Sequence, residues 1–91
     1  MIASTAPLSD AFAPSPRLAR LRHELARLID ARERAEFTFR LDADDVYCGG
    51  GRAAERRADA SGANLDRIER ELTAVRRAIR ATTAERWEVA R

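Results

Sequence analysis

The sequence predicts an all-α fold in which two helices fold back on each other as an antiparallel, coiled-coil-like hairpin. Two apolar ladders carry this prediction, because both step by alternating threes and fours, the spacing that keeps one stripe of a helix against a partner. Three consecutive glycines at 49–51 separate the ladders, and each would cost about 1 kcal/mol inside a helix. A chain that folds back at Gly50 lays the ladders against each other along their whole length, with Leu25 opposite Val75.

The large apolar members of the two ladders are expected to form the seam between the helices. Leu28 should lie opposite Leu72, and Leu21 opposite Ile79, in the most densely packed layers. The predicted seam consists of Leu18, Leu21, Leu25, Leu28, Leu65, Ile68, Leu72, Val75 and Ile79.

The first helix is expected to begin at Ser15 and Pro16. A serine at this position can cap free amide groups, and a proline at the first helical position loses no hydrogen bond. Residues 1–14 contain several turn formers and no apolar period, so we interpret them as a flexible N-terminal arm. They lack the basic start and continuous apolar stretch of a signal peptide. Residues 15–91 then form a single helical-hairpin domain.

Residues 36–48 allow two interpretations. Phe37, Phe39 and Leu41 alternate with polar residues, which is the pattern of a half-buried strand. A short β-hairpin here, between two helices, would make the fold α+β and would end the first helix at about residue 35. Phe39 and Val46 nevertheless stay on the helical ladder, and an isolated two-stranded hairpin is marginal in water. In this second interpretation the first helix continues to about residue 47.

The second helix likewise has two alternative starts. Residues 52–60 are rich in alanine and in charged side chains, which favours a helix from 52 to about 90. Gly62 weakens this segment, and Ser61 or Asn64 can cap a fresh helix. The alternative is therefore a helix from 64 to about 90.

The sequence contains no recognisable pattern of catalytic or metal-binding residues. It has one cysteine, Cys48, and one histidine, His23, too few for an internal disulfide or for the usual zinc ligands. A phosphate-binding loop needs Lys and Ser or Thr after its glycines, and alanines follow Arg52 instead. We therefore expect no enzymatic activity, no cofactor, no metal and no small-molecule substrate. No stretch approaches the roughly 18 apolar residues of a membrane span, so a cytoplasmic protein without membrane association is expected.

All 17 basic residues are arginine, and the formal net charge is +2. Arginine, alanine, glycine and aspartate dominate, as in proteins encoded by GC-rich bacterial or phage genomes, and this bias weakens the usual link between arginine and phosphate recognition. The basic charge nevertheless gathers towards both ends of the chain, which a hairpin brings together. The candidate nucleic-acid contacts are Arg17, Arg20, Arg76, Arg77, Arg80 and Arg86.

A hairpin of two helices cannot cover all of its apolar side chains. Five residues fall outside the predicted seam and should face a partner, namely Ile29, Phe37, Leu41, Trp87 and Val89. The leading functional hypothesis is therefore a non-enzymatic adaptor, scaffold or regulator that assembles with itself or with another protein. The second hypothesis is an accessory protein that contacts nucleic acid through its arginines.

The order of helix, strand-like Phe37-Thr38-Phe39 and helix-opening Ala63-Asn64-Leu65-Asp66 resembles the small phage head-completion proteins of the gpW type. The resemblance covers about half of the chain, and the triple glycine and the alanine-rich residues 52–61 depart from it. It implies two helices flanking a β-hairpin and a role between the capsid portal and the tail. The helical-hairpin oligomerisation cores of phage small terminases resemble this chain in architecture alone.

Overall fold

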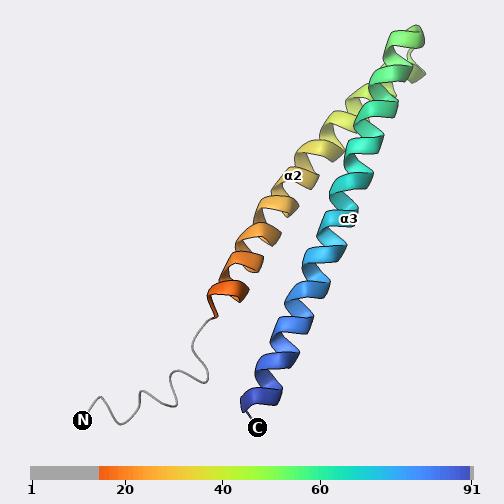
Figure 1. Ribbon diagram of the computed structural model, residues 1–91. Coiled ribbons are helices and arrows are strands. Elements are labelled where there is room, and N and C mark those ends of the chain that lie inside the picture. The colour runs from red at the N-terminus through yellow and green to blue at the C-terminus, as the bar shows by residue number, and fades with distance from the viewer. Residues whose placement is uncertain (1–14, 91) are drawn as a thin grey trace.

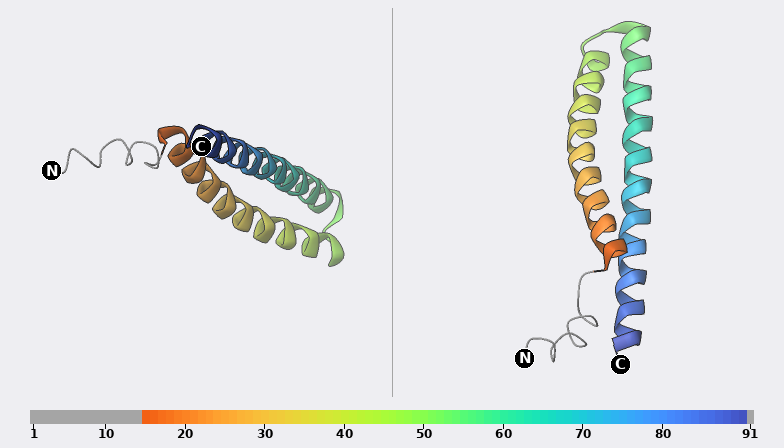
Figure 2. Two further views of the ribbon diagram at one scale, coloured as in Figure 1. Left: turned by 90° about the horizontal axis from the view of Figure 1, so that it is seen from below. Right: turned by 60° about the vertical axis from the view of Figure 1, so that its left-hand side comes forward.

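The computed structural model describes residues 15–90, and the side chains of residues 15–88, as two long helices joined by a short turn (Figure 1). Helix α2 comprises Pro16–Tyr47 and helix α3 comprises Gly51–Ala90. The two helices lie side by side and run antiparallel in all views (Figures 1 and 2). The predicted all-α hairpin is therefore confirmed. The predicted N-terminal arm, residues 1–14, lies outside the described residues.

The α+β alternative is wrong, because residues 36–47 continue α2 and the described residues contain no strand. Val46 is half-buried on the ladder that faces α3, and Phe39 packs against Gly62 of that helix. The helix thus satisfies its own backbone hydrogen bonds while it extends the seam, which two short strands without a third could not do. The β-hairpin implied by the gpW-type resemblance is consequently absent from residues 36–48.

Helix α2 begins as the sequence indicates. The side-chain oxygen of Ser15 accepts a hydrogen bond from the backbone N–H of Leu18 at 3.3 Å, and its carbonyl oxygen accepts one from Ala19 at 2.9 Å. Ser15 itself is extended, with φ −70° and ψ 137°, and Pro16 follows as the first helical residue. This is the geometry in which Ser and Pro are most favourable at a helix start.

The turn after α2 is a Schellman motif built on glycine. The N–H of Gly49 donates to the carbonyl of Val46 at 3.1 Å, and the N–H of Gly50 donates to the carbonyl of Asp45 at 2.8 Å. Gly49 has a φ of +86°, the left-handed conformation that glycine adopts most readily. Gly50 is required for a different reason, because a β carbon there would stand 2.7 Å from the β carbon of Ala54.

Helix α3 runs without a break through Ser61 and Gly62. The hydroxyl of Ser61 donates to the carbonyl oxygens of Arg57 at 2.9 Å and Ala58 at 3.3 Å, so it bonds to the preceding turn and caps no new helix. Helix α3 has 40 residues and α2 has 32, lengths of about 60 Å and 48 Å at 1.5 Å per residue. The C-terminal end of α3 consequently extends past the start of α2 (Figure 2). Because the helices pair about Gly50, Pro16 is level with residue 84, and we call residues 85–90 the α3 overhang.

The core is a single seam between the helices. Its central cluster contains Leu28, Ala35, Ile68 and Leu72, and Leu28 and Leu72 are the largest fully buried side chains, at 2% and 0% exposure. Leu18 and Thr82 are buried near the open end, and Ala54 is buried beneath the turn. All nine residues of the predicted seam are buried or half-buried.

Candidate functional site

The hairpin leaves large apolar side chains in solvent. Phe37 is 61% exposed, Leu41 is 51% exposed and Trp87 is 63% exposed, and all three were expected to face a partner. Ile29 differs from its prediction, because it is half-buried and packs against the central cluster of the seam. It lies beside the seam, where α3 covers part of its side chain. The side chain of Val89, the fifth residue of the predicted interface, lies outside the described residues.

The three exposed residues of the predicted interface lie at two separate sites. Phe37 and Leu41 are four residues apart and therefore lie on one face of α2. Trp87 belongs to the α3 overhang, about 36 Å further along the rod, since Phe37 is level with residue 63 of α3 and each residue adds about 1.5 Å. A partner that covers the first site need not touch the second.

Phe37 and Leu41 sit in the middle of a ladder on the solvent-exposed side of α2, outside the seam. Its members step by threes and fours like the seam itself, and every one of them is exposed. We call this set the outer ladder of α2, and it consists of Arg27, Asp30, Arg34, Phe37, Leu41, Asp44 and, at the cap that ends the helix, Cys48. Arg34 forms an ion pair with Asp30 along the helix. Arg27 pairs with Glu24, and the hydrogen bond that it donates lowers the pKa of the Glu24 carboxyl below its ordinary value.

Polar residues also interrupt the seam. Arg32 follows the seam residue Leu25 by seven residues and therefore lies on the seam stripe of α2. Its guanidinium Nε lies 3.6 Å from a carboxylate oxygen of Glu36 and 3.9 Å from one of Glu69. A second ion pair joins the helices near the turn, where a guanidinium nitrogen of Arg57 lies 3.6 Å from a carboxylate oxygen of Asp45. Ion pairs between partly exposed side chains at these distances add at most about 1 kcal/mol each. Their main consequence is that they favour this alignment of the helices over a shifted one.

The six arginines predicted to contact nucleic acid do not form one patch. Arg17 and Arg20 precede Ala31 and Arg34 by fourteen residues each, so the seven-residue repeat of the seam places all four on one side of the rod. Ala31 and Arg34 line a shallow hollow on that side. Arg86 is half-buried on the α3 overhang.

Arg76 and Arg80 lie on the opposite side of the rod. Glu36 and Glu69 mark this side, because both pair with Arg32, and Arg76 follows Glu69 by one seven-residue repeat. Arg22 precedes Glu36 by two such repeats, which brings it to the same side and to the level of residue 78. Sequence reasoning missed Arg22, although its seven-residue spacing was the available signal. We call Arg22, Arg76 and Arg80 the basic cluster.

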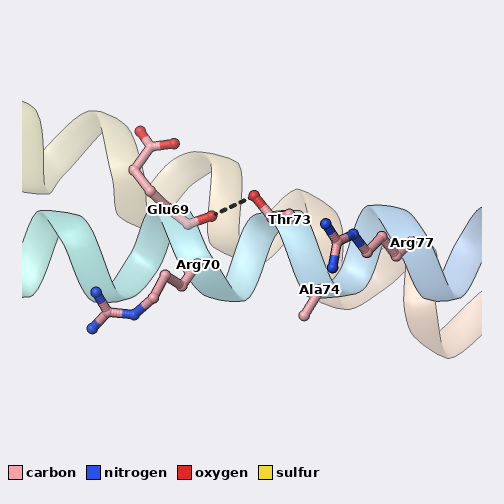
Figure 3. Close-up of a pocket in the computed structure, with 5 residues that line it drawn as sticks. All are labelled: Glu69, Arg70, Thr73, Ala74 and Arg77. Carbon is pink, nitrogen blue, oxygen red and sulfur yellow. Dashed lines mark hydrogen bonds between the residues drawn. The ribbon is translucent and has the colours of Figure 1, made fainter.

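Arg77 lies with Arg70 on a third face, the outer surface of α3. Figure 3 shows these arginines on either side of Ala74, and together with Glu69 and Thr73 they line a hollow on this single helix. The hydroxyl of Thr73 donates to the carbonyl oxygen of Glu69 at 3.0 Å (Figure 3). It is therefore engaged with its own helix and does not point into the hollow as a free nucleophile or ligand donor.

Other candidate chemistry is sparse in the described part of the chain. Within residues 15–88, no group of three His, Cys, Asp or Glu side chains is placed to hold a metal ion. Cys48 is an exposed free thiol beside the turn, and His23 is exposed on α2. No helix in the described segment has an apolar stretch that would cross a lipid bilayer.

Comparison with known proteins adds no relative to this description. No protein-family model matches the chain, and neither the curated proteins nor the solved structures include a match.

Proposed function

We propose that this protein is a non-enzymatic interaction module, a cytoplasmic adaptor or scaffold that acts by assembling with itself or by docking on a larger protein. The observation that carries this proposal is the exposure of Phe37, Leu41 and Trp87 on a hairpin whose core is one seam thick. Large apolar side chains cost free energy in water, about 1.5–3 kcal/mol for each one that a partner would bury. A chain that works alone gains nothing from keeping them on its surface.

Sedimentation of the full chain over a wide concentration range tests the self-assembly branch of this proposal. The monomer has a mass of 10.2 kDa, and we expect a reversible rise to a multiple of that mass as the concentration increases. Circular dichroism should show a helical chain under the same conditions. A folded protein that sediments as a monomer at every concentration would remove self-assembly and leave docking on another protein.

The basic cluster supports a second candidate function, contact with nucleic acid, as in a phage DNA-packaging or head-completion component. Arg22, Arg76 and Arg80 lie on one side of the rod at one level, and no acid in the described part of the chain forms an ion pair with them. Like charges gathered in this way repel one another, and phosphates would relieve the repulsion.

A gel-shift titration with double-stranded DNA tests this second function. Neutralising several phosphates makes affinity fall steeply between about 50 and 200 mM salt. We expect Arg76→Glu with Arg80→Glu to abolish such binding. The matched control is Arg52→Glu with Arg56→Glu, which reverses two exposed arginines of the same helix at the turn end. Equal loss in both variants would indicate a response to total charge, and the basic cluster would not be the binding site.

A further inference from the structure

The outer ladder of α2 has the spacing of a helix–helix seam but no helix packed on it. Its seven members alternate steps of three and four over residues 27–48, and all seven are exposed. A stripe with this spacing stays on one side of a helix that pairs with another helix. Phe37 and Leu41 form its apolar centre, and charged residues lie on both sides of them.

The outer ladder is complementary to itself when one copy is turned end to end. With a two-fold axis midway between Phe37 and Leu41, Phe37 of one copy faces Leu41 of the other. In the same arrangement Arg34 faces Asp44. Each of these facing pairs occurs twice, because a two-fold interface presents the same patch from both subunits.

A parallel pairing of the same faces is unfavourable. It would place Arg34 against Arg34 and Asp44 against Asp44, and like charges that face each other across an interface are destabilising. The distribution of charge along the outer ladder therefore selects the antiparallel orientation.

We propose that a second copy of this chain packs antiparallel on the outer ladder of α2, centred on Phe37 and Leu41. The result is a two-fold dimer in which the two α2 helices are in the middle and the two α3 helices are outside. This inference rests on the proposed function and names its partner. Four apolar side chains at the centre form a small interface, so we expect a dissociation constant on the order of micromolar.

Charge exchange tests the pairing of Arg34 with Asp44. Arg34→Asp and Asp44→Arg, each alone, place like charges opposite each other twice, and each should weaken dimerisation about tenfold, which corresponds to about 1.4 kcal/mol. The double variant R34D/D44R restores opposite charges across the interface and should recover the dimer. Ion pairs within a single α2 helix cannot explain this recovery, because the double variant, like the R34D variant, lacks the Asp30–Arg34 ion pair. A double variant as weak as the single ones would overturn the proposed orientation.

Truncation tests the apolar centre. Phe37→Ser with Leu41→Ser should abolish the dimer, while circular dichroism remains helical because neither side chain belongs to the core cluster. Tyr47→Ser is the matched control, since Tyr47 is 93% exposed on the same helix but is not a member of the outer ladder. If the wild-type chain forms an oligomer and the double serine variant still forms it, this inference is overturned and the proposed function stands. A wild-type chain that is monomeric throughout would overturn both this inference and self-assembly.

A mixed crosslinking experiment reports the orientation directly. The variants R34C/C48S and D44C/C48S each carry one cysteine, and we expect oxidation of their mixture to give a disulfide-linked dimer. Neither variant alone should crosslink, because the antiparallel arrangement places position 34 of one copy opposite position 44 of the other. If each variant alone forms disulfide-linked dimers and the mixture forms no additional mixed dimer, the pairing is parallel and the inference is contradicted.

Discussion

The aromatic ring of Phe39 on α2 lies against Gly62 on α3, so close that a β carbon at Gly62 would stand 3.1 Å from Cε1 of the ring. A glycine within a helix costs about 1 kcal/mol relative to alanine, and this contact gives the glycine a packing role. It also explains how Phe39 keeps its place on the helical ladder in a stretch whose alternation suggests a strand. The bulky ring lies opposite Gly62, the one glycine within α3 after its first residue.

Replacing Gly62 with alanine should raise the free energy of unfolding by about 0.5 kcal/mol. Alanine favours the helix by about 1 kcal/mol, and part of this gain is lost because the ring of Phe39, which is 37% exposed, must move outward. In a Phe39→Ala background the same substitution should give the full gain. Denaturant unfolding of the four proteins measures the difference. An equal gain in both backgrounds would show that the ring does not contact Gly62.

The turn should be more sensitive at Gly50 than at Gly49. A β carbon at Gly50 would stand 2.7 Å from the β carbon of Ala54 and 2.8 Å from the carbonyl oxygen of Asp45, so Gly50→Ala should cost about 2–3 kcal/mol. Gly49 has open space around it but a φ of +86°, and Gly49→Ala should cost about 1–2 kcal/mol. Gly49→Asn should cost less than the alanine variant, because asparagine tolerates this conformation. Thermal unfolding ranks the three variants, and a neutral Gly50→Ala would contradict the described turn.

Truncating Leu72 should destabilise the hairpin far more than truncating Leu41. Leu72 is fully buried in the central cluster, and Leu72→Ala should cost about 2–5 kcal/mol. Leu41 is half exposed on the opposite face of α2, so Leu41→Ala should change the stability of the monomer by at most about 0.5 kcal/mol. Both are measured by urea unfolding at low protein concentration, where self-association does not contribute. Similar losses in the two variants would mean that the seam does not carry the stability.

The buried hydroxyl of Thr82 should be dispensable. Thr82 is 5% exposed and its Oγ1 has no hydrogen-bond partner among the described residues, whereas the exposed Thr73 donates to Glu69. Thr82→Val keeps the shape and removes the unsatisfied group, so it should stabilise the hairpin by about 1 kcal/mol. Thr73→Val, the matched control, should bring no such gain. Loss of stability in the Thr82→Val variant would show that this hydroxyl is hydrogen-bonded in solution.

The fold could be predicted because large apolar residues repeat with one period on both sides of the triple glycine. Leu28 and Leu72 carry most of that signal, and the structure buries both completely. The conformation of residues 36–48 stayed ambiguous because Phe37 and Phe39 alternate with polar residues as in a strand. Only the tertiary contact of Phe39 with Gly62, together with the absence of a third strand among the described residues, makes the helix the better solution.

The candidate surfaces were harder to predict than the fold. The sequence identified Phe37, Leu41 and Trp87 as exposed, because each falls outside the seam. Ile29 was also expected to be exposed, but it is half-buried. It lies beside the seam, where the neighbouring helix covers part of its side chain, and a pattern of seam positions alone does not include such flanking contacts. The sequence places the candidate arginines at similar positions along the rod. Arg17 and Arg76 nevertheless lie on opposite sides of it, because they occupy different positions around their helices. Resolving that separation requires the pairing of Glu36 and Glu69 with Arg32.

An engineered disulfide between the seam residues of the two helices tests the antiparallel hairpin itself. Leu25 and Val75 both pack against the central cluster from opposite helices, so Leu25→Cys with Val75→Cys, in a Cys48→Ser background, should crosslink on oxidation. The product should migrate as a compact chain with the mass of one monomer, and should unfold at a higher temperature than its reduced form. A helical, folded protein whose two cysteines remain free, or crosslink only between molecules, would contradict the antiparallel hairpin.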